Sequence, residues 1–191
     1  IVKMDYSFTG VILGILFGLA AGVMAGIAHG AIVSNFNVPP FLITLASQNI
    51  IYGIAQLLTG NQVISCLEPA AFTFLGGGRL FGIPFSVCIL VIVALISFWL
   101  LNRTTFGRQV YAVGGNKEAS NLSGVSSRRI TTVSYAISGF TAALAGIVLA
   151  SMNQQAIAKA AQGYENDVLT AIVVGGTSLM GGEGSLQGAM F

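Results

Sequence analysis

The sequence predicts an all-α, polytopic transmembrane helical bundle of about five spans, with a broken helix near the C-terminus. Hydrophobic residues make up 54% of the 191 residues and charged residues only 7%, whereas roughly a quarter of the residues in a soluble domain are charged. Apolar stretches of about 20 residues, the length that crosses the hydrocarbon core of a bilayer, recur along the chain. Glycine pairs interrupt the last of these stretches.

Four stretches are long and apolar enough to be spans, and a fifth begins near Asp167 and runs toward the C-terminus. The stretch 40–59 is the most polar of the four. The four predicted spans are residues 8–29, 40–59, 83–101 and 130–151.

The basic residues predict the orientation of the spans. Five of the eight Lys and Arg residues lie within positions 103–129, and basic residues near span ends favour the cytoplasm. We therefore expect 103–129 to be a cytoplasmic loop. Because successive spans cross in opposite directions, the segment 31–38 is then expected inside. The segments 1–7 (with Lys3), 60–82 and 152–166 are expected outside.

The first span carries a glycine at every fourth position. Small residues allow the backbones of membrane helices to approach closely. A row with i,i+4 spacing winds around the helix, so one parallel partner could not touch every member. We expect this helix to pack among several neighbours, a structural role that is favoured over any transport chemistry. The glycines are Gly10, Gly14, Gly18, Gly22, Gly26 and Gly30.

The fifth span is interrupted after only eight residues, counted from Asp167. If Asp167 marks the outer interface, the first glycine pair lies near the middle of the bilayer. Broken helices at this depth commonly form substrate sites, and an intramembrane acid is a functional candidate. The alternative is a tightly packed, continuous helix whose hydroxyls bond back to its own carbonyls. The candidate residues of a translocation pathway are Gly175, Gly176, Thr177, Ser178 and Glu183.

Several kinds of chemistry find no support in the sequence. It has one His and no HExxH motif, so we expect neither a zinc site nor a Ser/His/Asp triad. The segment "GGTSLMGG" lacks the Lys-Ser/Thr of a phosphate-binding loop, so we expect no cofactor and no ATP hydrolysis by the chain itself. A net charge of +2 does not indicate nucleic-acid binding. The chain is predicted not to be an enzyme.

The loop 103–129 contains one short predicted helix. Asn116 is a suitable N-cap, Glu118 lies in the first turn and Gly124 is a suitable C′ residue, while Gly114 and Gly115 form a hinge before it. A helix of about seven residues is marginal in water, so it needs a surface to dock on. The alternative is a loop whose charges only fix the topology. The candidate residues of this element are Asn116, Lys117, Glu118, Ala119, Ser120 and Gly124.

Three blocks of sequence resemble the membrane permease subunits of bacterial ABC importers for monosaccharides. They are "RTTFGRQVYAVGGNKEASNLSGVSSRRI", "SYAISGFTAALAGIVLAS" and "GYENDVLTAIVVGGTSLMGGEGSLQGA". The resemblance implies a multi-pass protein of the bacterial inner membrane, with residues 1–191 a partial permease domain of a longer protein. It also implies a second permease copy, a cytosolic ATP-binding subunit that contacts a coupling helix at 117–123, and an extracytoplasmic sugar-binding protein.

Other functions stay open. Within the same superfamily, the cargo could be a branched-chain amino acid, a nucleoside or a signalling sugar. An ion-driven secondary transporter would use Glu183 as a proton or cation relay. A membrane scaffold without transport activity is favoured only by the glycine row of the first span.

Overall fold

A computed structural model describes most of the chain. The segment 1–7, with Lys3, and parts of the predicted fifth span lie outside the described residues. The described residues are 8–36, 39–66, 70–80, 82–178, 181–184 and 188. Their helices are α1 (Phe8–Asn35), α2 (Pro40–Thr59), α3 (Ala70–Gly77), α4 (Phe85–Arg103), α5 (Thr105–Gly115), α6 (Lys117–Leu122), α7 (Ser127–Asn153) and α8 (Tyr164–Val174).

Helices α1, α2, α4 and α7 are long and apolar enough to cross a membrane. They match the four predicted spans closely: α2 has the predicted bounds, α1 and α7 extend beyond the predicted ends, and α4 lies two residues later than predicted. The all-α polytopic fold is therefore confirmed. Large apolar side chains on these helices, such as Leu95 and Trp99 of α4, are exposed, as expected for surfaces that face lipid.

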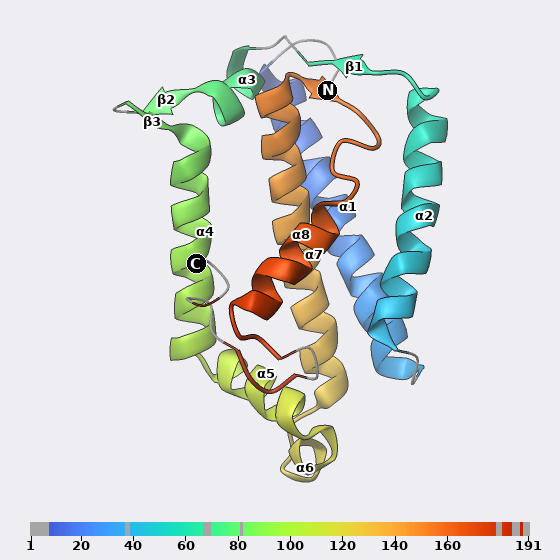
Figure 1. The fold of residues 1–191 in the computed structure, drawn as a ribbon, viewed down its shortest axis with the longest axis vertical. Coiled ribbons are helices and arrows are strands. Elements are labelled where there is room, and N and C mark those ends of the chain that lie inside the picture. The colour runs from blue at the N-terminus through green and yellow to red at the C-terminus, as the bar shows by residue number, and fades with distance from the viewer. Residues whose placement is uncertain are drawn as a thin grey trace.

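The long helices stand side by side, and short elements occupy both ends of the bundle (Figure 1). Helices α1 and α7 lie at the centre, with α2 and α4 on opposite sides of them in this view. We call the end that carries α5 and α6 the α6 end. We call the opposite end, which carries α3 and the short strands, the α3 end. Helices α1 and α4 run toward the α6 end, and α2 and α7 run back toward the α3 end. This is the alternation that the sequence predicts.

Helices α1 and α7 run antiparallel and pack through the glycine row. A Cβ added at Gly22 would lie 2.6 Å from the carbonyl oxygen of Gly139, and one at Gly30 would lie 2.7 Å from Thr132 Cα. One added at Gly26 would meet the backbone of α7 at Tyr135. The glycines are therefore required for contact between the two backbones.

Helix α1 has several neighbours, as expected, since it contacts α7, α2 and α3, but most of the glycine row faces one of them. The four glycines Gly18, Gly22, Gly26 and Gly30 all face α7. Of the other two members of the row, Gly10 is buried and Gly14 is half-buried. An i,i+4 row is inclined to its helix axis, so a partner that crosses at an angle can follow the row over several turns. One antiparallel helix therefore serves most of the row.

A small core closes the α3 end. Val11 of α1, Cys66 and Phe72 of α3 are buried together. Ser151 of α7, which is 1% exposed, joins this end by hydrogen bonds: its hydroxyl donates to the Phe72 carbonyl over 2.5 Å and accepts from the Gly76 N–H over 2.7 Å.

Two short antiparallel pairings complete this end. Strands β1 (Ile64–Ser65) and β4 (Gln155–Ala156) pair with each other, and β2 (Arg79–Leu80) pairs with β3 (Ile83–Pro84). The first pairing ties the exit of α2 to the exit of α7. It fixes the point from which the chain leaves α7 toward α8.

Candidate functional site

Helix α6 has the caps that the sequence predicts. The Asn116 side chain accepts a hydrogen bond from the Ala119 N–H over 2.9 Å. At the other end, Gly124 adopts φ +82°. The N–H groups of Val125 and Gly124 donate to the carbonyls of Ser120 (3.0 Å) and Asn121 (3.1 Å). This is the hydrogen-bond pattern of a Schellman motif, for which glycine is the favoured residue.

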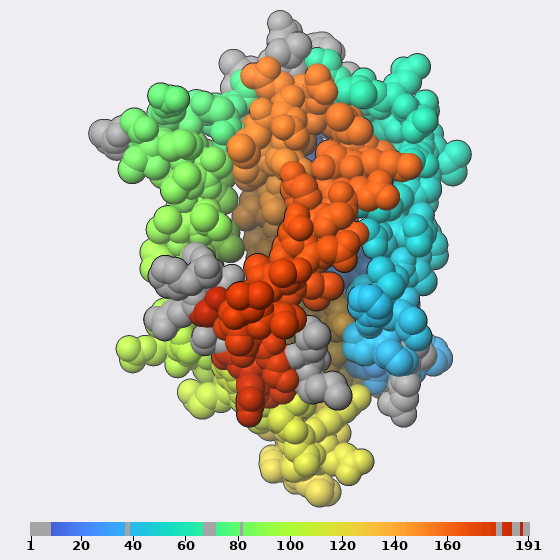
Figure 2. All heavy atoms as spheres, viewed as in Figure 1, coloured from blue at the N-terminus to red at the C-terminus, as the bar shows by residue number. Residues whose placement is uncertain are grey.

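Helix α6 protrudes from the bundle and exposes nearly all of its surface (Figures 1 and 2). Lys117, Glu118 and Ala119 are exposed, and Leu122 is 90% exposed. Ser120, which is buried, donates its hydroxyl to the Asn116 carbonyl over 2.8 Å. This end of the bundle therefore presents a six-residue helix with an exposed leucine.

The basic residues of the loop surround this element. None of them is buried, and they span the end of α4, helices α5 and α6, and the start of α7. Ser126 caps α7 by accepting a hydrogen bond from the Arg129 N–H over 3.4 Å. The α6 end is therefore positively charged over a wide area. The exposed basic residues are Arg103, Arg108, Lys117, Arg128 and Arg129.

The loop also contains a helix that the sequence analysis missed. It expected a hinge at Gly114 and Gly115, but both belong to α5, and the chain breaks at Asn116 with φ −153°. Thr104 caps α5 by accepting from the Gly107 N–H over 3.2 Å. The sequence does contain a signal for this helix: the apolar residues Phe106 and Val110 are four positions apart, and both lie on its half-buried side.

The broken helix is confirmed within the described residues. Helix α8 ends at Val174, and Gly176 follows with φ +80°. The Thr177 N–H donates to the Ile172 carbonyl over 3.1 Å, and the Gly176 N–H donates to Val173 over 3.0 Å. This second Schellman motif stops the helix, so the alternative of a continuous helix through Gly175 and Gly176 is wrong.

The conformation at Gly176 supports a specific test. No atom lies within 4 Å of a Cβ added there, so strain rather than crowding sets the cost. We expect Gly176→Val to destabilise the complete protein by about 1–2 kcal/mol, because a β-branched residue disfavours positive φ. Gly176→Asn, which tolerates this conformation, is the control. Equal melting temperatures of the two purified variants would contradict the assigned conformation.

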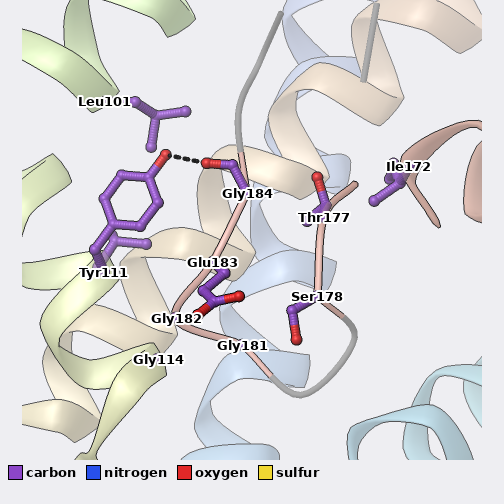
Figure 3. Close-up of a pocket in the computed structure, with 11 residues that line it drawn as sticks. Leu101, Tyr111, Gly114, Ile172, Thr177, Ser178, Gly181, Gly182, Glu183 and Gly184 are labelled. Carbon is purple, nitrogen blue, oxygen red and sulfur yellow. Dashed lines mark hydrogen bonds between the residues drawn. The ribbon is translucent and has the colours of Figure 1, made fainter. Parts of the chain in front are cut away.

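After Gly176 the chain forms a glycine-rich turn. The Ser178 N–H donates to the Glu183 carbonyl over 3.0 Å, and Gly181 and Gly182 both have positive φ. Figure 3 shows Thr177, Ser178 and Glu183 around this turn. The predicted pathway residues Thr177, Ser178 and Glu183 are therefore brought together.

The turn packs against α5. The Tyr111 hydroxyl donates to the Gly184 carbonyl over 3.0 Å (Figure 3). A Cβ added at Gly114 would lie 2.5 Å from the Gly182 nitrogen. A cavity of about 380 Å³ lies between the turn, α5 and Leu101 of α4. The loop that carries α6 is thus in direct contact with the segment that follows α8.

The depth of this turn differs from the expectation. The sequence analysis placed Gly175 and Gly176 near the middle of the membrane, with Asp167 at the outer interface. The structure places the turn at the α6 end, beside α5 and the last residues of α4. The reason is that α8 begins partway along the bundle, beside the middle of α2, so its 11 residues already carry the chain to this end.

The start of α8 is marked by a polar contact with α2, partway along the length of the bundle. The Gln48 side-chain nitrogen donates to Glu165 Oε1 over 2.9 Å, and the Gly163 N–H donates to Glu165 Oε2 over 2.9 Å. Gln48 lies near the middle of α2. The chain from β4 therefore runs partway down the face of the bundle before α8 starts (Figures 1 and 2), whereas the sequence analysis put all of 152–166 outside. The sequence analysis also did not identify Glu165 as a candidate functional residue.

Comparisons with known proteins agree on one family. Residues 2–191 match the family described as branched-chain amino acid transport system / permease component. The ribose import permease RbsC of Haemophilus influenzae is 38% identical over 84% of this chain and 51% of its own length. RbsC of Bacillus subtilis is 35% identical over 85% of this chain and 51% of its own length.

A third relative carries a different sugar in its name. The L-arabinose permease AraH of Escherichia coli is 36% identical over 83% of this chain and 48% of its own length. The chain therefore spans about half the length of the curated relatives it matches. No solved structure matches. By the match of nearly its whole length, and with four helices able to span a membrane among the described residues, this chain belongs to the branched-chain amino acid transport system permease family.

Proposed function

We propose that the chain is part of the permease subunit of an ATP-driven importer for monosaccharides. The observation that carries the proposal is α6, a capped and protruding helix with an exposed leucine at a basic end of the bundle. Relatives named as ribose and L-arabinose permeases support a monosaccharide cargo. ATP hydrolysis is assigned to a separate subunit, so the chain itself is not an enzyme.

In this proposal the α6 end faces the cytoplasm of a bacterium, across its inner membrane. The five basic residues of 103–129 lie at this end, and such residues favour the cytoplasmic side. Residues Asn116 to Ser120, with Gly124, form the coupling element, and its exposed side chains dock on a cytosolic ATP-binding subunit. A second permease copy completes the membrane unit, and an extracytoplasmic sugar-binding protein delivers the cargo at the α3 end.

The path from α6 to the cargo runs through α5. Helix α5 joins α6 at Asn116 and contacts the glycine-rich turn through Tyr111 and Gly114. When ATP binding moves α6, the turn moves with it. Gly175, Gly176, Thr177, Ser178 and Glu183 would then line the cytoplasmic mouth of the translocation pathway, next to the cavity on α5.

The experiment uses the complete permease, the ATP-binding subunit and the sugar-binding protein encoded with it. We expect the ATP-binding subunit to co-purify with the permease, and cells to take up radiolabelled D-ribose or L-arabinose only when all three are present. Leucine is the comparison cargo, because the family description names branched-chain amino acids. Uptake of leucine without either pentose would contradict the proposal, as would pentose uptake without the ATP-binding subunit.

A further inference from the structure

Apart from the glycine-rich turn, the chain has a second polar site between α2 and the start of α8. Glu165 has a hydrogen-bond donor on each carboxylate oxygen: Gln48 on one and the Gly163 N–H on the other, both at 2.9 Å. Gln48 and Glu165 are half-buried. A carboxylate and an amide therefore meet at the level of the middle of α2, a helix whose other face is apolar.

Helix α2 presents two chemically different faces. Gln48, Tyr52 and Gln56 follow one another at i,i+4 spacing and are all half-buried. The opposite face carries the exposed residues Ile54 and Leu57, the latter 85% exposed. The apolar face suits contact with lipid. The polar face points toward the neighbouring elements, among them the start of α8.

The depth of the pair makes its chemistry informative. Ionisable residues at membrane depth are costly, and they face the bundle interior or a water-filled cavity where they serve transport. Helix α8 begins beside Gln48 rather than at the end of the bundle. Helices that are discontinuous within the membrane commonly hold substrate in transporters. Both observations favour a hydrated substrate position at this point.

We propose that Gln48 and Glu165 form a binding site for an uncharged, hydroxyl-rich substrate as it crosses the membrane. The carboxylate accepts hydrogen bonds from hydroxyl groups, while the amide both donates and accepts. When substrate enters, its hydroxyls replace the direct bond between the two side chains. The site rests on the proposed sugar-import function and adds a position deeper in the bundle than the glycine-rich turn.

The first test is the pentose uptake assay with the complete permease and its two partner proteins. Gln48→Leu and Glu165→Gln are each expected to lower uptake about tenfold or more, because the first removes the amide's hydrogen bonds to the substrate and the second removes charge-assisted bonds to the carboxylate. ATP hydrolysis stimulated by the sugar-binding protein and recovery of the ATP-binding subunit should be unchanged. Asn49→Leu and Asp167→Asn make the same chemical changes at exposed neighbouring positions and should keep uptake within about twofold.

Uptake of Gln48→Leu and Glu165→Gln within about twofold of the unaltered protein would overturn the site. A parallel fall in the recovered ATP-binding subunit would also overturn it, because the pair would then only support folding. Loss of an ion-driven uptake in Glu165→Gln would assign the pair to a cation relay instead.

The second test does not depend on the cargo. In a complete permease without Cys66 and Cys88, we expect a hydrophilic maleimide to label Gln48→Cys at least about tenfold faster than Asn49→Cys, since only position 48 faces the hydrated side. Equal labelling would overturn the site even if the protein imports pentoses. Labelling of Gln48→Cys in a protein that imports no pentose would instead contradict the proposed function and leave a hydrated site for another cargo.

Discussion

Replacing Leu122 with glutamate is expected to abolish pentose uptake and co-purification of the ATP-binding subunit. Leu122 is 90% exposed on a helix that protrudes from the bundle, so the substitution leaves the fold of the permease intact. Burying a leucine side chain contributes about 1.5–3 kcal/mol. Losing that contribution and burying a charge in its place should weaken docking by more than about tenfold.

The matched control is Leu122→Met, which keeps an apolar side chain of similar volume. It should retain both uptake and co-purification. The melting temperatures of the purified permease variants should be equal, which separates loss of docking from loss of folding. If Leu122→Glu binds the ATP-binding subunit as tightly as the unaltered protein, α6 is not the docking element.

The substitution Gly26→Leu is expected to cost the complete permease at least about 3 kcal/mol of stability, the upper part of the range for overpacked sites. A Cβ at Gly26 would lie 3.0 Å from Ala136 Cα and would also meet the Tyr135 carbonyl. Both are backbone atoms of α7, which cannot rotate away as a side chain would. Separating α1 from α7 would remove the central contact of the bundle.

Gly53→Leu is the control for this experiment, because no atom lies within 4 Å of a Cβ added at Gly53 in α2. Both substitutions gain the same helix propensity, so the difference between them reports packing alone. We expect thermal unfolding of the detergent-purified proteins to show a lower midpoint for Gly26→Leu only. Equal midpoints would mean that α1 and α7 do not pack through this row.

Features of the fold that depend only on residues close together in the chain could be predicted from the sequence. Span lengths follow from local composition, and α2 begins and ends where its apolar run does. The caps of α6 depend on Asn116 and Gly124, a few positions apart. The stop of α8 depends on Gly176 and its own preceding turn. Each of these is determined by interactions within one helix and its flanks, so inspection of the residues was sufficient.

Features that depend on contacts between residues far apart in the chain could not be predicted from the sequence. The start of α8 is fixed by Gln48, which is 117 positions from Glu165. The exit of α7 is fixed by the pairing of Ile64 with Ala156. Neither contact leaves a periodic signal, and so the depth of the glycine-rich turn was misplaced. The two glycines at the end of α5 were read as a hinge, although Gly114 is needed for the close approach of Gly182.

The central claim is that ATP, acting through a subunit docked on α6, drives the import of a monosaccharide. The most direct measurement is uptake of labelled pentose, D-ribose or L-arabinose, by proteoliposomes that contain the complete permease with its ATP-binding subunit and sugar-binding protein. We expect uptake when ATP is present on the α6 side, and only background when a proton or sodium gradient is imposed without ATP. Gradient-driven uptake by the permease alone would contradict the claim.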